Sequence, residues 1–201
     1  MRGRSIKLII TAFSCILLFA FLSGGQSQNF LKNPNFEVVI KNEPASWETN
    51  NIPPILTVVS ISPKAKSGKN SLKLEVRDFH GTKIGGAAIQ GDISIPNAPL
   101  QLRGYALLNL KGGDQGMVAL CLETPSGSTV GLKDTSLTGS SAEFKPFSLK
   151  LAPPPAGPEV TKARVRLAIL GNPETDELHE GSSILFDDLA LETVTTQTPE
   201  K

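Results

Sequence analysis

The chain has 201 residues, a formal net charge of +1 and 19% charged residues, together with 18 glycines and 15 prolines. A chain of this length holds one domain or two small ones. No run of lysine or arginine supplies the basic stripe that a nucleic-acid-binding surface needs. The glycines and prolines favour turns between short strands over long surface helices. The composition therefore argues against a helical bundle, a disordered chain and a nucleic-acid-binding protein.

The N-terminal segment, residues 1–28, has the three-part pattern of a secretory signal peptide. A basic start is followed by an apolar run, residues 8–22, and then by a small, polar stretch. The apolar run is short for a bilayer span, which needs about 20 residues. We predict cleavage after Gly25 or Ser27 and an exported chain, extracellular or periplasmic, with no membrane attachment after cleavage. An uncleaved N-terminal anchor is the alternative.

A single cysteine, Cys121, follows that segment, so no intrachain disulfide can form in the exported chain. Cys15 lies inside the apolar run, which argues against lipid attachment. Cys121 stands in an apolar, strand-like run, residues 117–123, which favours a buried small hydrophobe over a nucleophile. Stability must therefore come from the core and from any metal that binds.

The rest of the chain shows the period of two that is typical of β-strands. The runs with strand character are residues 55–61, 71–77, 88–95, 101–110, 116–123, 144–151, 162–170 and 184–192. With shorter runs included, we predict about nine to ten strands and no amphipathic helix.

Turn signals separate these runs, among them Lys111–Asp114 and Pro125–Ser128. Antiparallel strands that are polar on one face need a second sheet to cover the other. The predicted fold class is therefore all-β, a two-sheet antiparallel β-sandwich of the jelly-roll type. We assign one such domain to residues 29–192 and a flexible tail to residues 193–201.

Four segments, in order, resemble carbohydrate-binding modules of families 4 and 9. Residues 29–37 (NFLKNPNFE) resemble the opening "NLLxNPGFE", and residues 44–47 (PASW) resemble the "PxxW" that follows it. Residues 66–74 (KSGKNSLKL) resemble "HSGKxSLxL", and residues 183–192 (SILFDDLALE) resemble "vxFDDVxLE". Asn35 replaces the usual glycine, but asparagine tolerates a left-handed turn. The resemblance implies a galactose-binding-domain-like jelly roll and a secreted, non-catalytic module whose partner is a polysaccharide or other glycan.

In the resembling modules a structural calcium joins the N-terminal segment to the last strand. The implied ligands are Glu37, Asp187 and Asp188, with carbonyl groups around Ser67, Gly68 and Lys69. Calcium takes about six to eight hard oxygen ligands, so the residue types are suitable. Successive strand residues point to opposite faces, so we expect only one of the two aspartates, preferably Asp187, to face the ion. The alternative is that these acids are solvated strand ends.

Aromatic residues that could form a sugar platform are scarce, since only one Trp, one Tyr and six Phe follow residue 28. We expect Trp47 in the core, and the strand patterns predict the same for Phe36, Phe144, Phe147 and Phe186. The candidate carbohydrate-binding residues are Tyr105, at a framework position, and the loop pair Phe79 and His80. A capped surface loop is the alternative for that pair. We expect weak glycan binding on one sheet face.

No pattern for catalysis stands out. His80 and His179 lie in separate loops, and no zinc motif, serine elbow or phosphate-binding glycine loop is present. Residues 176–180 (DELHE) are better explained as a charged loop than as a metal site. We predict that the protein is not an enzyme, although paired carboxylates would meet only in space. The alternative to sugar binding is an extracellular structural or protein-interaction domain, with another extracellular protein as its partner.

Overall fold

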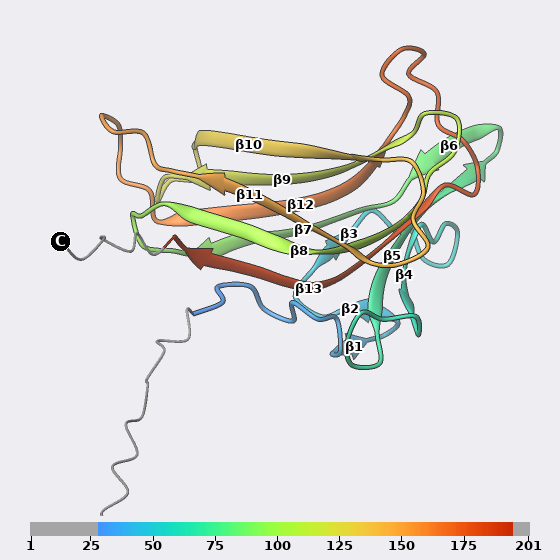
Figure 1. The fold of residues 1–201 in the computed structure, drawn as a ribbon, viewed down its shortest axis with the longest axis horizontal. Helices are drawn as coiled ribbons and strands as arrows, with labels where there is room; N and C mark the ends of the chain where they lie inside the picture. The colour runs from blue at the N-terminus through green and yellow to red at the C-terminus, as the bar shows by residue number, and fades with distance from the viewer. Residues whose placement is uncertain (1–27, 195–201) are drawn as a thin grey trace, which may run out of the picture.

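The computed structural model describes residues 28–194, and all regular secondary structure in that range is β (Figure 1). The predicted signal peptide, apart from Gln28, and most of the predicted tail lie outside the described residues. Within residues 28–194 there is no helix of the length and apolarity needed to cross a bilayer.

Thirteen strands are formed in this range. They are β1 (Val39–Ile40), β2 (Glu43–Pro44), β3 (Glu48–Thr49), β4 (Val59–Ser62), β5 (Ser71–Phe79), β6 (Thr82–Gly85), β7 (Ala87–Ser94), β8 (Leu100–Asn109), β9 (Gln115–Glu123), β10 (Thr129–Thr138), β11 (Lys145–Leu151), β12 (Lys162–Leu170) and β13 (Ser183–Thr193). Ten of them have four residues or more, which agrees with the predicted number, and β1, β2 and β3 are two-residue strands.

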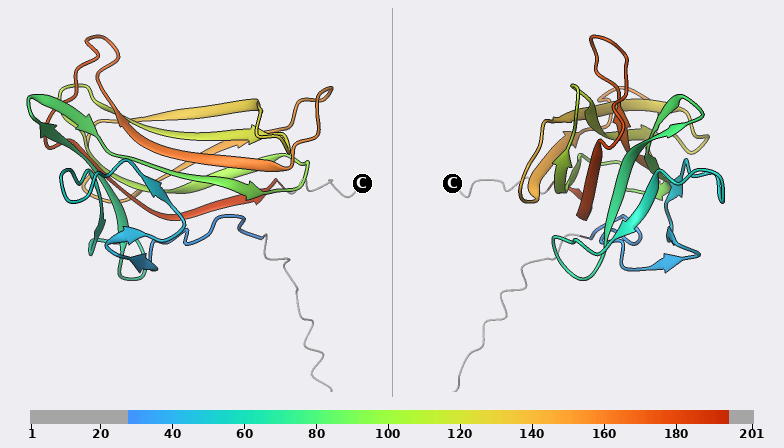
Figure 2. Two further views of the ribbon diagram at one scale, coloured as in Figure 1. Left: turned by 180° about the vertical axis from the view of Figure 1, so that it is seen from behind. Right: turned by 90° about the vertical axis from the view of Figure 1, so that its right-hand side faces the viewer.

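Eleven of the strands form two layers that lie face to face, and β1 and β2 pair as a separate two-stranded sheet (Figures 1 and 2). One is a five-stranded sheet of order β10-β9-β12-β7-β3, and the other is a six-stranded sheet in which β11-β8-β13-β5-β4 are joined by β6 beside β5. All strand pairs are antiparallel. The predicted two-sheet β-sandwich of the jelly-roll type is confirmed.

The core fills the space between the sheets and follows from the alternation in the sequence. In β12 the apolar residues Ala163, Val165 and Leu167 are fully buried, whereas Arg164 and Arg166 between them are exposed. Leu72 and Leu74 of β5 point into the same core. Burying one side of each strand and hydrating the other fixes the register of each sheet.

Strand β10 was not predicted, and β4 begins later than expected. β10 is an edge strand, and Leu132 in its middle is 61% exposed, so it has no apolar face to mark it in the sequence. The predicted strand at residues 55–61 is shortened to Val59–Ser62 because Ile52 and Leu56 bridge each other across a turn that contains Pro53 and Pro54.

Candidate functional site

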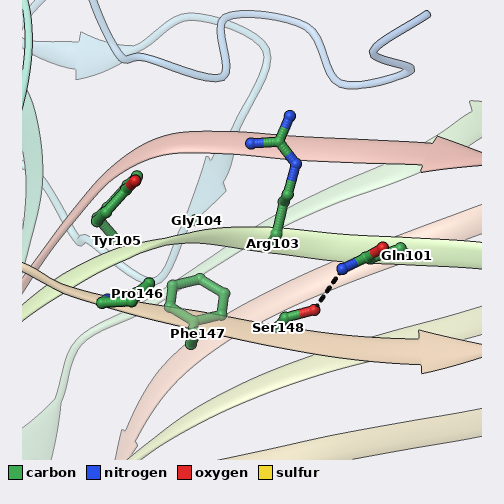
Figure 3. Close-up of a pocket in the computed structure, with 7 residues that line it drawn as sticks. All are labelled: Gln101, Arg103, Gly104, Tyr105, Pro146, Phe147 and Ser148. Atoms are coloured by element: carbon green, nitrogen blue, oxygen red, sulfur yellow. Dashed lines mark hydrogen bonds between the residues drawn. The ribbon is translucent and has the colours of Figure 1, made fainter. Parts of the chain in front are cut away.

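Tyr105 lines a pocket on the outer face of the six-stranded sheet. In β8 Leu102 and Ala106 are buried in the core, so Arg103 and Tyr105 project to the opposite face. The pocket has a volume of about 330 Å³ and is lined by Gln101, Arg103, Gly104, Tyr105, Pro146, Phe147 and Ser148 (Figure 3). All seven residues belong to two neighbouring strands, β8 and β11.

The floor of the pocket depends on Gly104. It pairs with Phe147 of β11, and a Cβ atom on Gly104 would lie 3.0 Å from Phe147 Cζ and 2.4 Å from Leu189 Cδ2. The missing side chain lets the Phe147 ring pack beneath β8. On the opposite, outer face of β8, Arg103 and Tyr105 project on either side of Gly104 (Figure 3).

One wall of the pocket is apolar and the other is polar. Tyr105 stands opposite Pro146 across the strand pair, and proline is tolerated there because β11 is an edge strand. On the polar side the Gln101 amide donates a hydrogen bond to Ser148 Oγ at 2.7 Å (Figure 3). The Arg103 guanidinium pairs with the Glu192 carboxylate at 3.0 Å.

A second, more polar hollow adjoins the first and shares Arg103 with it. It has a volume of about 600 Å³ and is lined by Gln28, Asn29, Pro34, Asn35, Arg103, Asp188, Leu189, Ala190 and Glu192. The N-terminal segment forms its far wall because Asn29 binds β13 with both ends of its amide, donating to the Leu189 carbonyl at 2.9 Å and accepting from the Leu191 N–H at 3.0 Å. The two hollows together run across β8 and β13.

The predicted pair Phe79 and His80 does not line the Tyr105 pocket. Phe79 ends β5, is half-buried and packs against the core, and exposed His80 occupies the turn to β6. The two rings contact each other edge to face, with centroids 4.6 Å apart. The structure therefore separates the predicted sugar-binding residues into a pocket residue, Tyr105, and a hairpin turn.

The expected core aromatics are mostly buried. Trp47 is 6% exposed and packs on Phe36, with ring centroids 5.4 Å apart. Phe147 and Phe186 are also buried, whereas Phe144 is half-buried. Cys121 is half-buried, and burial raises the pKa of its thiol, which disfavours the thiolate.

The premise that the adjacent Asp187 and Asp188 side chains point to opposite faces does not hold, since both contact Ser67. A β-bulge after Asp187 gives Asp188 a φ of 49°, so that both side chains turn toward the loop before β5. Asp187 Oδ2 accepts the N–H groups of Lys66 (2.7 Å) and Ser67 (3.1 Å), and Asp188 Oδ1 accepts the Ser67 hydroxyl at 2.7 Å. Burial raises the pKa of Asp187, although these N–H groups oppose the shift.

Glu37 holds the other end of the same loop. Its Oε1 accepts the N–H groups of Lys69 at 2.7 Å and Asn70 at 3.0 Å, and these bonds hold the pKa of Glu37 below its ordinary value. A Cβ on Gly68, which has a φ of 66°, would lie 2.3 Å from the same oxygen. Only glycine lets the loop come this close.

The proposed calcium ligands thus lie at two ends of one loop. The structure brings Asp187 and Asp188 to Ser67, and Glu37 to Lys69, through N–H and hydroxyl donors rather than carbonyl groups. Within residues 28–194, no three His, Cys, Asp or Glu side chains lie close enough to hold one metal ion. The acids supply the hard oxygens that calcium prefers, and calcium stays a prediction.

The two histidines lie in different parts of the structure. His179 Nδ1 is 3.0 Å from Asp114 Oδ1, and its backbone N–H donates to Asp114 Oδ2 at 2.9 Å. The sequence marked Lys111–Asp114 as a turn but contained no signal for this pairing. The neighbouring acids Asp176, Glu177 and Glu180 are exposed, as expected for a charged loop.

Sequence reasoning missed the neighbours of Tyr105 in the pocket. Arg103 could have been found, because it lies two residues from Tyr105 in an alternating run and must share its face. Pro146 and Ser148 could not, because the register of β11 on β8 joins residues about 40 positions apart.

No family model matches the chain, and no curated protein matches it. Solved structures match its fold. The CBM22-2 xylan-binding domain of Paenibacillus barcinonensis Xyn10C aligns with a TM-score of 0.52 and 14% identity, over 80% of this chain and 98% of that one. A cyclase from Fischerella sp. TAU, solved with 4-(1H-indol-3-yl)butan-2-one, aligns with a TM-score of 0.56 and 17% identity, over 84% and 98%.

Larger proteins match over part of their length. A putative glycoside hydrolase from Bacteroides thetaiotaomicron aligns with a TM-score of 0.60 and 15% identity, over 80% of this chain and 70% of that one. The chain spans only 21% of a bacteriophage CBA120 tailspike domain and 28% of an arabinose-bound GH51 α-L-arabinofuranosidase. At these identities the likeness shows the fold alone, and the chain has the jelly-roll fold found in carbohydrate-binding modules.

Proposed function

We propose that the protein is an exported, non-catalytic carbohydrate-binding module of the family 4/9 type that binds a glycan at the Tyr105 pocket. The observation that carries the proposal is the position of Tyr105, whose ring lines a hollow beside Arg103, Gln101 and Ser148. Pyranose rings stack on aromatic faces while nearby polar groups bond their hydroxyls. The xylan-binding neighbours of the same fold add support.

The shape of the surface suits a chain of sugars better than a single one. The polar hollow that shares Arg103 with the pocket offers the amides of Asn29 and Asn35 and the acids Asp188 and Glu192. A glycan that stacks one ring on Tyr105 would place the next units over β13. With one aromatic contact worth about 0.5–1.5 kcal/mol beyond its buried area, we expect weak binding.

The test is affinity gel electrophoresis through soluble plant, algal and bacterial polysaccharides, using protein produced from the full sequence. We expect at least one glycan to slow the wild-type protein, Tyr105→Ala to abolish the effect, and Tyr105→Phe, which keeps the ring, to retain most of it. Retardation that survives Tyr105→Ala would move the site elsewhere.

Absence of retardation in every gel would favour the alternative, a structural or protein-interaction domain. The observation on that side is the exposure of apolar residues near the N-terminus: Val38 is 56% exposed and Ile40 is 59% exposed.

We further propose that a structural calcium joins Glu37 and Asp187 to the loop between them. A metal ion that binds the folded chain but not the unfolded chain raises the melting temperature. We expect added calcium to raise the melting temperature of the wild-type protein, and Glu37→Ala and Asp187→Ala each to remove that shift. The measurement is a thermal melt in excess calcium and in chelator, and identical wild-type curves would rule the metal out.

A further inference from the structure

The charged groups around the Tyr105 pocket are unevenly distributed. Arg103 is the only charged residue among the seven that line it, and no carboxylate does. A second cation lies just beside it, because Lys66 Nζ is 5.0 Å from the centre of the Tyr105 ring. The ring therefore has a guanidinium two residues away along β8 and an ammonium over it.

The hydrogen-bonding groups of the pocket also favour an anionic ligand, because donors outnumber acceptors. Guanidinium and ammonium groups only donate, and the Gln101 amide already donates to Ser148. The acceptors in the pocket are limited to the Gln101 carbonyl and the hydroxyls of Tyr105 and Ser148. Neutral sugar hydroxyls donate as readily as they accept, whereas a carboxylate only accepts, so the pocket complements a carboxylate better.

The pairing of Arg103 with Glu192 leaves room for such a ligand. The Arg103 side chain is 49% exposed, and an exposed ion pair of this kind contributes little. Glu192 occupies Nε and one Nη of the guanidinium, at 3.4 and 3.0 Å. Arginine has five N–H donors, so others remain for a second carboxylate.

We infer that the Tyr105 pocket binds a carboxylate-bearing sugar, a hexuronate within a polysaccharide. The sugar ring packs on Tyr105 and Pro146, and its carboxylate lies between Arg103 and Lys66. This inference rests on the proposed glycan-binding function and names the ligand class for the same pocket (Figure 3).

The experiment compares two pairs of polymers by isothermal titration calorimetry on protein produced from the full sequence. The pairs are polygalacturonate and alginate, each beside its carboxyl-reduced derivative, which keeps the linkage but loses the charge. We expect at least one acidic polymer to bind about tenfold or more tighter than its reduced form, the equivalent of one charge-assisted hydrogen bond. Higher salt should reduce that difference.

Three variants show whether the preference belongs to this pocket. Arg103→Gln and Lys66→Gln should each remove most of the preference for the acidic polymer over its reduced form, because each removes one of the two cations that would face the carboxylate. Lys133→Gln removes the same charge from exposed strand β10 in the other sheet and should change nothing.

The outcomes separate the two proposals. Equal binding of acidic and reduced polymers, or binding of neutral glycans alone, overturns the hexuronate inference and leaves the glycan-binding function standing. An equal loss of preference in Lys133→Gln overturns it as well, because attraction would then depend on overall charge. If no polymer of any kind binds, the glycan-binding function itself fails.

Discussion

Gly104 shows how one missing side chain shapes the core beneath the binding surface. It allows Phe147 and Leu189 to pack closely against β8 from within. Its backbone lies between Arg103 and Tyr105 and also lines the pocket on the outer face. Its position in the middle of a strand, where glycine ordinarily weakens a sheet, has this physical reason.

We expect Gly104→Ala to lower the free energy of unfolding by about 1–3 kcal/mol, because the new methyl group would overlap Leu189 and Phe147. Urea unfolding measures the change. Gly131→Ala in β10 is the matched control, since its nearest heavy atom would lie at an ordinary 3.5 Å. Equal stability of the two variants would contradict the packing argument.

Glu75 makes a pH-dependent contribution to stability. Burial alone would raise the pKa of its carboxyl, but hydrogen bonds from Lys73 and Arg77 outweigh burial and hold the pKa below the ordinary 4.5. The folded-state pKa is therefore the lower one, so the stabilisation is complete above about pH 4.5 and is lost as the pH falls through the folded-state value.

Accordingly, Glu75→Gln should cost about 0.5–1 kcal/mol at pH 7, and the difference from the wild type should shrink below pH 4.5. Chemical unfolding at a series of pH values gives the curve. Glu143→Gln, at an exposed site without an ion pair in the described structure, serves as the control. A difference that stays constant down to pH 3 would refute the assignment.

At the scale of elements, two loops are held by buried or half-buried acids. The loop before β5 is fastened by Glu37 and by the Asp187–Asp188 pair, and the turn between β8 and β9 is fastened to the loop before β13 by Asp114. In each case a carboxylate accepts backbone N–H groups that have no strand partner. Such bonds satisfy groups that would be costly to bury alone.

Replacing Asp114 with alanine should therefore lower the free energy of unfolding by about 1–3 kcal/mol, because the His179 N–H loses the carboxylate oxygen to which it donates. Asp114→Asn keeps one acceptor oxygen and should cost less. Equilibrium unfolding of both variants tests whether Asp114→Ala is the less stable of the two. Hydrogen exchange at the His179 N–H shows whether the loss of stability arises at this contact. An alanine variant as stable as the wild type would show that the turn is held by other contacts.

The elements divide into those that the sequence reveals and those that it does not. β5 and β12 alternate strictly, bury one face, and were predicted to within two residues at each end. β10 has no continuous apolar face and was missed. The β-bulge that places the Asp188 side chain beside that of Asp187 could not be predicted from the sequence either. It depends on the pairing of β13 with β8, and no residue type in this segment indicates it.

Only part of the candidate site could be predicted from the sequence. Alternation within β8 places Arg103 beside Tyr105, but the pocket exists only because Pro146 and Ser148 of β11 stand opposite them. The register of two strands far apart in sequence is set by the whole core. The fold class therefore follows from local patterns, whereas the site requires the assembled sandwich.

At the scale of the whole molecule, Asn29 joins the two ends of the described chain. It binds β13 through Leu189 and Leu191, which lie at least 160 positions away, and also accepts the N–H of Leu31. Phe30 adds a backbone bond to Leu191. The N-terminal segment thus lies along the part of β13 that β5 leaves unpaired, with Leu31 buried in the core.

We expect Asn29→Ala to lower the free energy of unfolding by about 1–3 kcal/mol and to speed hydrogen exchange at Leu191. The reason is that the Leu189 carbonyl and the N–H groups of Leu31 and Leu191 all lose their partner. Asn29→Asp keeps the oxygen that accepts the two N–H groups, so its free energy of unfolding should lie between those of the wild type and Asn29→Ala. Asn97→Ala, at an exposed turn, should be close to neutral. If the Asn29 and Asn97 variants unfold alike, the segment is docked by its apolar residues alone.

The place of β13 also bears on when the molecule can fold. β13 lies between β8 and β5 in the middle of its sheet, yet it is the last of the thirteen strands to leave the ribosome. A nascent chain with twelve strands made has two separated pieces of that sheet and nothing to join them. Contacts of such sequence separation form slowly. The six-stranded sheet can therefore close only after β13 has been synthesised, so the two faces of the core come together late relative to translation.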